Sequence, residues 1–466
     1  MPSTLYEIWD ILSNFVLKNN EYINEKKLPL AKGTNVRYNH FTEVIVLERI
    51  IYHIDANSAF LSWEAVYRIK HLMSKTDLRE IPSAVGGSIE QRHGIILAKS
   101  IPAKKYKIQT GESVPEALKK CPNLVIVPPN YNLYEQSSKA FVSILREYSP
   151  TVEQYSIDEC FMDMSGTRLL WGEPIKVANQ IKDRIRDELG FTVNIGISTN
   201  KLLAKMAGDF RKPDLVHTLF PDEISNKMWN LPVSDLFYVG RATNKKLLNL
   251  GITTIGQLAH SDPIMLRHYF KKHGEIIWAF ANGFDSSSVE AIRPDNKGYG
   301  NSTTISFDAK DTLTAKKVLL SLSETVAARL RKDKVKAGVV SIGIKDSEFR
   351  YAGHQMVMGT PTNITNEIHQ YACTLFDELW DGSPIRHLGV HTTRIVPENE
   401  ARQLSFINNI DFEKQERLDT AIDKIRLRYG IDAVKRATFI NTPIDHLGGG
   451  ISREKRTVDY SRIDIM

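Results

Sequence analysis

The chain has 466 residues with a net charge of +6, and its 42% hydrophobic and 25% charged content is typical of a soluble multidomain protein. No apolar run approaches the ~20 residues that cross a bilayer, and the N-terminus lacks a basic stretch before an apolar one, so we expect neither membrane span nor signal peptide. Three isolated cysteines (Cys121, Cys160 and Cys373) argue against disulfides and a zinc site and favour the reducing cytoplasm.

The first elements in chain order are a helix and a polar stretch over residues 1–44, which carry no motif. An apolar run then predicts a strand that ends on Asp55. Helical spacing follows, and Asn57 or Ser58 is expected to cap this helix.

Short strands and amphipathic helices alternate from residue 81 to residue 213, which predicts an α+β sheet with helices on one face. The predicted strands are 81–87, 93–100, 124–129, two within 152–166, and 191–199; the helices are 112–123, 132–150, 173–190 and 200–213.

The pattern becomes helical near residue 220, and strands return between residues 297 and 400 with helices near 314–332 and 362–380. A polar stretch at 286–300 reads as a linker, and one further helix is expected at 412–430.

Lysine and arginine gather in four places between residues 201 and 336. Each group alone is typical of a solvated helix face, whereas four together favour a nucleic-acid track. The groups are Lys201, Lys205, Arg211 and Lys212; Arg241, Lys245 and Lys246; Arg267, Lys271 and Lys272; and Arg329, Arg331, Lys332, Lys334 and Lys336.

Two acidic residues, Asp158 and Glu159, interrupt an apolar strand-turn-strand segment, and Asp55 ends another apolar strand. An isolated acidic pair is more often a surface feature. If these strands are neighbours, however, three carboxylates converge, and hard divalent cations such as Mg²⁺ relieve their repulsion. Two such ions roughly 3.5–4 Å apart support phosphoryl or nucleotidyl transfer.

The segments "HIDANSAF" and, about 100 residues later, "YSIDECFMD" resemble the paired catalytic motifs of the Y-family, translesion DNA polymerases of the bacterial DinB and UmuC (impB/mucB/samB) type. Ser156, Ile157, Asp158 and Glu159 match the second motif. The resemblance extends to about residue 400. It implies a template-directed DNA polymerase that adds dNTPs to a primer, bypasses damaged bases with low fidelity, and lacks proofreading.

The resemblance also implies an α+β, multidomain, right-hand architecture with palm, fingers, helical thumb and little finger. The implied domains are an N-terminal extension (1–46), palm (47–60 and 126–219), fingers (61–125), thumb with a helix-hairpin-helix (220–288), linker (289–298), little finger (299–400) and tail (401–466).

Catalytic roles follow from the resemblance. Asp55, Asp158 and Glu159 would hold two Mg²⁺ ions, with the backbone carbonyl of Ala56 as a further ligand. Phe60 would act as a steric gate against the 2′-hydroxyl of a ribonucleotide, although its position equally suits a core residue.

Ser100, Lys104 and Lys212 are the implied contacts of the incoming triphosphate. The family often has Tyr and Arg where this chain has Ile101 and Lys104. Lysine supplies a point charge without the bidentate fork of arginine, and Ser100 could replace the missing hydroxyl. Lys104 also suits a solvated surface.

Residues 231–259 resemble a helix-hairpin-helix, in which backbone N–H groups bind phosphate without reading bases. Gly240, Arg241, Lys245 and Lys246 would contact DNA here. An ordinary helical hairpin is the alternative.

The segment "RQLSFIN" (402–408) resembles a short peptide that binds the sliding clamp, with Gln403, Leu404 and Phe406 as contacts, and it suits a packing segment equally well. Primer–template DNA and dNTPs are the implied partners, the clamp is a candidate partner, and we expect a cytoplasmic monomer.

Two other functions remain open from the residues alone. One is a palm-fold nucleotide cyclase that pairs Asp-Glu carboxylates with metals. The other is a non-catalytic DNA-binding subunit of a repair complex.

Overall fold

The computed structural model describes residues 49–90, 92, 94–292, 294–400 and 412–449. The chain divides into two units, and the described residues belong to the second, residues 47–466. The predicted N-terminal helix and the clamp motif at Gln403, Leu404 and Phe406 lie outside the described residues. None of the helices described is long and apolar enough to cross a membrane.

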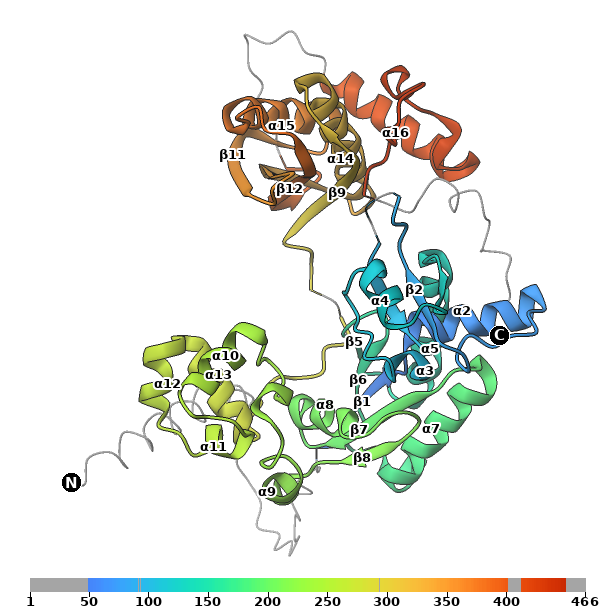
Figure 1. Ribbon diagram of the computed structural model, residues 1–466, viewed down its shortest axis with the longest axis vertical. Helices are drawn as coiled ribbons and strands as arrows, with labels where there is room; N and C mark the ends of the chain where they lie inside the picture. The colour runs from blue at the N-terminus through green and yellow to red at the C-terminus, as the bar shows by residue number, and fades with distance from the viewer. Residues whose placement is uncertain (1–48, 91, 93, 293, 401–411, 450–466) are drawn as a thin grey trace, which may run out of the picture. The chain divides into compact units, whose positions relative to one another are not determined.

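The strands of the first sheet lie between residues 51 and 218. This sheet has five strands in the order β5-β6-β1-β7-β8 (Figure 1). Its strands are β1 (Ile51–Ala56), β5 (Val152–Gln154), β6 (Glu159–Asp163), β7 (Val193–Ser198) and β8 (Val216–Thr218). The helices around it are α2 (Ala59–Leu72), α5 (Tyr131–Tyr148), α6 (Arg168–Trp171), α7 (Pro174–Leu189) and α8 (Lys201–Asp209). The predicted strand-turn-strand over 152–166 is confirmed as the β5–β6 hairpin.

Helices cover both faces of this sheet, so the predicted one-sided arrangement is wrong. Tyr52 and Ile54 pack into the main core beside α2, α5 and α7. The alternate residues of β1 point the other way: Ile51 packs against Ala204 of α8. Because side chains alternate along a strand, His53 and Asp55 share the α8 face with Ile51.

Close approach of α8 to β7 depends on Gly196. A Cβ at this position would lie 1.9 Å from the carbonyl oxygen of Ala204 and 2.4 Å from the amide nitrogen of Gly208. Glycine therefore lets the backbone of α8 lie directly on the sheet, beside the end of β1.

The capping prediction for α2 is also wrong. Ser58 occupies the N-cap position with a left-handed backbone (φ 51°) and makes no capping hydrogen bond. Instead, Ser62 donates its hydroxyl to the carbonyl of Asn57 at 2.7 Å. A left-handed Ser58 turns the chain sharply between Asp55 and Phe60.

A small three-stranded sheet, in the order β3-β2-β4, follows α2. Its elements are β2 (Ser83–Gly86), β3 (Ile96–Lys99), α3 (Ile101–Lys104), α4 (Val114–Lys120) and β4 (Val125–Val127). Its own core includes Ile96, Ile108 and Leu124.

Residues 221–281 are helical: η2 (Pro221–Glu223), α9 (Ile224–Lys227), η3 (Val233–Asp235), α10 (Arg241–Asn249), α11 (Ile255–Ala259), α12 (Pro263–Phe270) and α13 (Lys272–Ala281). They share one core with the α8 residues Leu202, Leu203 and Met206. The first helix of the predicted hairpin proves to be only the 3-10 turn η3, and the next helix, α10, begins after Gly240.

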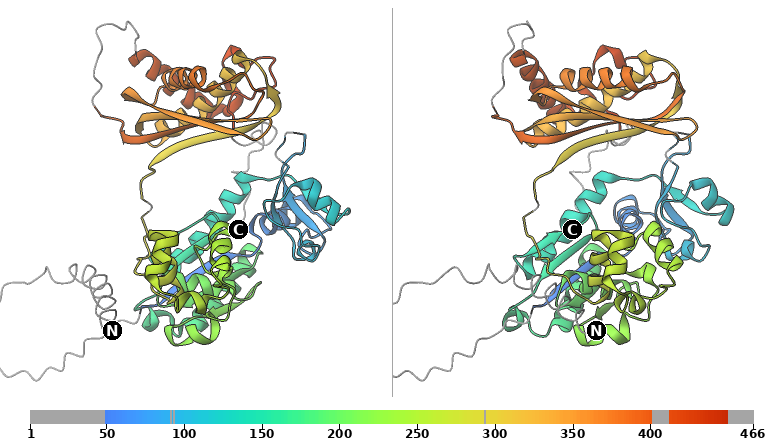
Figure 2. Two further views of the ribbon diagram at one scale, coloured as in Figure 1. Left: turned by 60° about the vertical axis from the view of Figure 1, so that its left-hand side comes forward. Right: turned by 90° about the vertical axis from the view of Figure 1, so that its left-hand side faces the viewer.

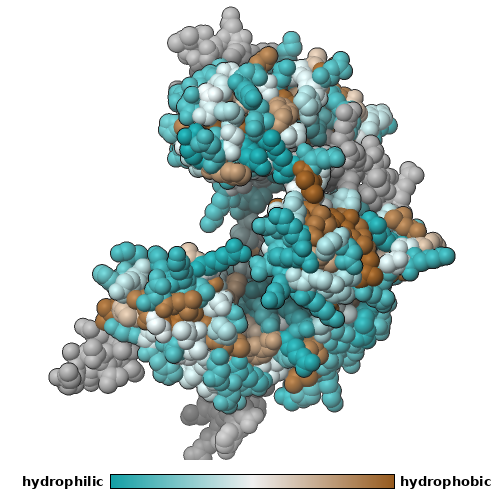
Figure 3. All heavy atoms as spheres, viewed as in Figure 1, coloured by the Kyte–Doolittle hydropathy of each residue, from teal (hydrophilic) through white to brown (hydrophobic). Residues whose placement is uncertain are grey.

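A second, four-stranded sheet, in the order β11-β10-β12-β9, forms the C-terminal part. Its elements are β9 (Gly298–Ala309), α14 (Thr312–Lys332), β10 (Val335–Asp346), β11 (Tyr351–Thr362), α15 (Thr365–Leu379) and β12 (Ile385–Pro397). Helices α14 and α15 pack side by side on one face of the sheet (Figure 2). Hydrophilic residues predominate on the visible surface of this part (Figure 3).

Charged groups attach the last described segment, α16 (Phe412–Tyr429), η4 (Ile431–Ala433) and η5 (Ala437–Phe439), to α14. Arg331 pairs with Asp423 at 2.6 Å and with Asp419 at 3.1 Å. Glu324, which is 4% exposed, pairs with Arg426 and Arg436. Because these charges are largely buried, each requires its partner.

Candidate active site

The antiparallel pairing of β1 with β6 brings two of the predicted carboxylates together. Asp55 lies opposite Glu159 in the register. The amide of Ala56 donates to the carbonyl of Asp158 at 3.0 Å, which fixes the third acidic residue beside the end of β1. The carboxylates that the sequence separates by about 100 residues are therefore neighbours at one sheet edge.

Ser156 organises the turn before β6. Its hydroxyl donates to the carboxylate of Asp158 at 2.6 Å and accepts hydrogen bonds from the amides of Asp158 and Glu159. A serine that bonds two following amides holds a tight turn in one conformation. The serine of "SIDE" thus fixes the backbone that carries both acids.

An open cleft lies at this edge, between the end of β1 and the small sheet. Six residues that the sequence singled out line it: Asp55, Ala56, Phe60, Lys104, Asp158 and Lys212. Lys99 at the end of β3 and Thr110 in the turn between α3 and α4 also line the cleft and were not predicted.

The ring of Phe60 forms part of the cleft wall, and two tyrosine rings pack against it. It stacks on Tyr134 with the ring centroids 4.5 Å apart and 8° between the planes, and it meets Tyr131 edge-on at 6.3 Å. Aromatic pairs of this kind contribute ~0.5–1.5 kcal/mol beyond their burial. The ring is therefore a rigid part of the wall as well as a member of the core.

Lys212 forms an ion pair with Asp55 and lies 2.9 Å from Asp209. Burial alone would lower the pKa of Lys212, but these two carboxylates outweigh it and raise the pKa above its usual range. Burial raises the pKa of Asp55 despite the ammonium beside it. One lysine therefore only partly compensates the burial of Asp55.

Glu159 is held by two groups on the α8 face. The ammonium of Lys205 donates to Glu159 Oε2 at 2.7 Å, and His53 Nε2 lies 3.5 Å from the same oxygen. Burial would raise the pKa of Glu159, but hydrogen bonds from His53 and Lys205 outweigh it and lower the pKa to about 2. Burial lowers the pKa of His53, so the ring is neutral near pH 7 and Lys205 supplies the opposing charge.

The donor set fits magnesium by its chemistry. Three carboxylates and a backbone carbonyl are hard oxygen ligands of the kind Mg²⁺ prefers, and Asp55 is 9% exposed with its charge incompletely balanced. Within the part of the chain that the structure describes, no three acidic, histidine or cysteine side chains converge in a metal-binding arrangement. Lys212 and Lys205 pair with the carboxylates instead, so Lys212 must leave Asp55 when a cation binds there.

Ser100 is not available to a nucleotide, contrary to the prediction. It is 2% exposed, and its hydroxyl donates to the carbonyl of Ile81 while accepting from the amides of Ser83 and Ala103. Ser100 caps α3 and ties it to β2. Lys104, at the other end of α3, lines the cleft, and its role as a nucleotide contact stays a prediction.

The predicted DNA contacts lie along α10, with Gly240 and Arg241 at its start and Lys245 and Lys246 further along it. Gly240, Arg241, Lys245 and Lys246 are all exposed, and a Cβ at Gly240 would meet no atom within 4 Å. A helix start with open space before it and basic side chains around it suits a phosphate group.

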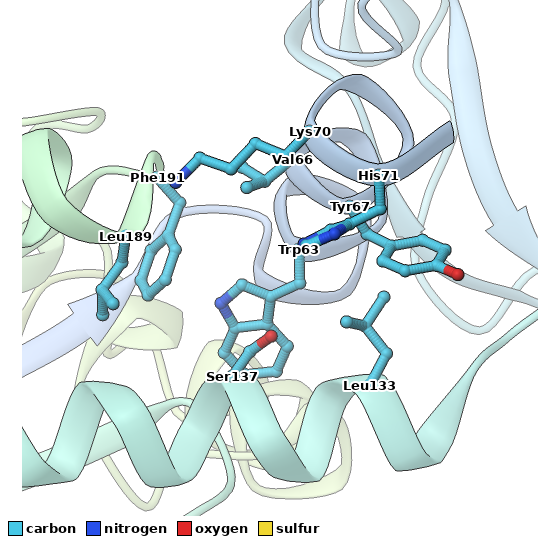
Figure 4. Close-up of a pocket in the computed structure, with 9 residues that line it drawn as sticks. All are labelled: Trp63, Val66, Tyr67, Lys70, His71, Leu133, Ser137, Leu189 and Phe191. Atoms are coloured by element: carbon cyan, nitrogen blue, oxygen red, sulfur yellow. The ribbon is translucent and has the colours of Figure 1, made fainter. Parts of the chain in front are cut away.

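A smaller pocket lies between α2 and α5 (Figure 4). Its walls are mainly apolar, with Trp63, Leu133 and Phe191 among them and Lys70 and His71 beside them. No carboxylate lines it, so the larger cleft is the candidate active site.

Sequence reasoning also missed His53, and it named Lys205 only as a member of a basic group, without a role in this site. His53 lies two residues before Asp55 and so shares its face of the strand. Lys201 and Lys205 are four residues apart, and on a helix this spacing places both on one side. The two-residue alternation of a strand and the four-residue spacing on a helix were the sequence signals that could have indicated His53 and Lys205.

Comparison with known protein families finds matches to three segments of this chain. Residues 54–209 match the impB/mucB/samB family, residues 221–252 match the IMS family HHH motif, and residues 296–406 match the C-terminal domain of the impB/mucB/samB family.

Among curated proteins, the DNA polymerase IV of Clostridium acetobutylicum is 43% identical over 394 residues, covering 84% of this chain and 99% of that protein. DNA polymerase IV 1 of Bacillus subtilis is 34% identical over 394 residues, covering 84% of this chain and 93% of that protein. The solved structure of a chimeric Y-family DNA polymerase has the same fold, with a TM-score of 0.64 and 19% identity over 75% of this chain and 99% of that one.

Proposed function

This chain belongs to the impB/mucB/samB family of Y-family DNA polymerases, and from that membership we propose that it copies damaged DNA templates by two-metal nucleotidyl transfer. It is a DNA-directed DNA polymerase of the translesion class. The observation that carries the proposed mechanism is the register that sets Asp55 opposite Glu159, with Asp158 bonded to the same strand end.

In this proposal, Asp55, Asp158, Glu159 and the carbonyl of Ala56 hold two Mg²⁺ ions. Bound ions would lower the pKa of the primer 3′-hydroxyl and stabilise charge on the α-phosphate and the departing pyrophosphate. Ser156 keeps the Asp158 carboxylate oriented, and the raised pKa of Lys212 keeps this residue cationic for the triphosphate.

Nucleotide selection would rest on the cleft walls. Phe60, fixed by Tyr134, would collide with a 2′-hydroxyl and so favour dNTPs. Lys104 and Lys212 would neutralise the triphosphate from opposite walls of the cleft. Low fidelity and the absence of proofreading remain part of the proposal, as do the palm, fingers, thumb and little-finger boundaries given above.

Primer extension on undamaged and abasic templates tests the proposal. Wild-type protein should extend both, and Asp158→Ala should lose extension by at least about 10³-fold while still binding primed DNA. If the protein makes a cyclic product without a template and extends no primer, it is a cyclase. If Asp158→Ala leaves every activity unchanged, the protein is a non-catalytic subunit.

A further inference from the structure

Lys205 occupies an unusual position between the acidic centre and the helical region of residues 221–281. On one side its ammonium bonds Glu159 Oε2 at 2.7 Å and lies 3.5 Å from His53 Nε2. On the other side it lies 5.7 Å from the ring centre of Tyr155 and 5.4 Å from that of Phe237. Its side chain is 12% exposed, so this ammonium is largely withdrawn from water.

Two rings and a carboxylate together fix this ammonium. A cation over an aromatic face gains ~0.5–2 kcal/mol, most when it is desolvated. Tyr155 and Phe237 also contact each other edge-on, with centroids 6.4 Å apart. Tyr155 belongs to the turn that carries Asp158 and Glu159, whereas Phe237 belongs to the helical region.

His53 and Lys205 both contact the same oxygen of Glu159, Oε2. The carboxylate group of Glu159 is thereby held in one orientation. Its other oxygen, Oε1, is not used by these two contacts and can bind a cation. His53 has no freedom to move away, because it is 1% exposed and a Cβ at Gly208 would lie 3.1 Å from its Nδ1.

We propose that Lys205 is a positioning residue for the catalytic carboxylate Glu159, and that Phe237 holds Lys205, so that the helical region sets the orientation of a metal ligand. This inference rests on the proposed polymerase function. Two measurements separate it from that function: steady-state kinetics of single-nucleotide addition, and Mn²⁺ binding to the DNA-free, full-length protein.

The test compares Lys205→Met with Lys201→Met. Lys201 lies on the same helix, forms an equally close pair with Glu153 at 2.7 Å, and lies 5.0 Å from the ring centre of Phe161, but Glu153 is not a metal ligand. Lys205→Met should lower kcat by about 10–100-fold with little change in the KM for dNTP, as expected when the support of a metal ligand is lost. Lys201→Met should retain wild-type kcat.

Mn²⁺ binding gives a readout that a structural defect would not reproduce. Lys205→Met removes a cation that competes for Glu159, so Mn²⁺ should bind about 3- to 10-fold more tightly even though kcat falls. Lys205→Arg, which keeps the charge, should recover part of kcat. Wild-type kcat in Lys205→Met, or unchanged or weaker Mn²⁺ binding, would overturn the assignment. If the wild-type protein extends no primer, the polymerase proposal fails, yet the Mn²⁺ comparison still decides the role of Lys205.

The link to the helical region is tested by Phe237→Leu, with Phe280→Leu as its matched control. Phe280 stacks on Phe237 with centroids 6.4 Å apart, whereas among the described residues the cation–π contacts of Lys205 are with Tyr155 and Phe237. Phe237→Leu should lower kcat about threefold, the value expected for a lost cation–π contact, and should add nothing to Lys205→Met. Phe280→Leu should have no effect. Additive effects of Phe237→Leu and Lys205→Met would show that Phe237 acts separately.

Discussion

Lys212 holds the Asp55 carboxylate by an ion pair while its second carboxylate contact is Asp209, 2.9 Å away. Lys212 therefore lines the cleft beside Asp55. A phosphate group that binds beside Asp55 would lie within reach of its ammonium. A metal ion bound at Asp55 and a triphosphate bound beside it would together favour contact of Lys212 with the phosphate over its ion pair with Asp55.

Lys212→Ala should reduce kcat/KM for dNTP by about 10–100-fold, since a hydrogen bond to a charged group contributes ~1.5–3 kcal/mol. Most of the loss should appear in KM if Lys212 serves binding. Lys227→Ala removes a surface pair with Glu223 and serves as control. An unchanged KM in Lys212→Ala would remove this lysine from the nucleotide site.

Phe60→Val should raise ribonucleotide incorporation relative to deoxynucleotide incorporation by about tenfold or more, because a smaller side chain leaves room for the 2′-hydroxyl. The ratio of kcat/KM for dCTP to that for CTP measures this effect. Phe349→Val is the control, because Phe349 is exposed and is not among the residues that line the cleft. A constant ratio would return Phe60 to a purely structural role.

Replacing Arg241, Lys245 and Lys246 with alanine should weaken the binding of primed DNA for all sequences alike. Each lost phosphate contact should reduce the slope of log K against log salt by about 0.9. Fluorescence anisotropy from 50 to 200 mM salt, roughly the range over which such contacts are screened, gives the slope. Lys139→Ala, a solvated lysine on α5, should leave it unchanged.

Glu324→Gln should destabilise the C-terminal part by ~3 kcal/mol, because Arg426 and Arg436 lose their buried counter-charge. Limited proteolysis should then cut within residues 412–449 earlier than in wild type. Glu135→Gln, which breaks an exposed pair, is the control. Equal proteolysis of both variants would mean that other contacts attach α16.

Cys373 should react slowly with iodoacetamide at pH 8. Burial raises the pKa of its thiol to about 11, so the reactive thiolate is a minor species, and its rate should rise about tenfold per pH unit until the pH approaches that pKa. Cys160 should not react in the native protein, since burial raises its pKa to about 12. Mass spectrometry of native and urea-unfolded protein distinguishes the two thiols.

The acidic centre was predictable because each of its two motifs is local. Asp55 lies near the end of an apolar strand, and Asp158 and Glu159 lie where a turn passes into β6. Pattern alone left their meeting dependent on these strands being neighbours, and the resemblance to the paired family motifs predicted it. Ser100 was misjudged because its sequence neighbourhood does not reveal that three backbone groups, from Ile81, Ser83 and Ala103, consume its hydroxyl. The second helical face of the sheet was missed because the close approach of α8 depends on Gly196, which reads in sequence as an ordinary strand residue.

The α8 helix belongs to two cores at once: Ala204 packs against the sheet, and Leu202, Leu203 and Met206 pack into the helical region. A truncation that ends near residue 219 would therefore leave an apolar surface without its cover and should aggregate. Modular exchange with a relative is better made beyond residue 290, because Val289 still packs against Ile51, Phe161 and Ala204 and the amide of Glu290 donates to Glu153. Protein engineers should treat residues 49–290 as one inseparable module.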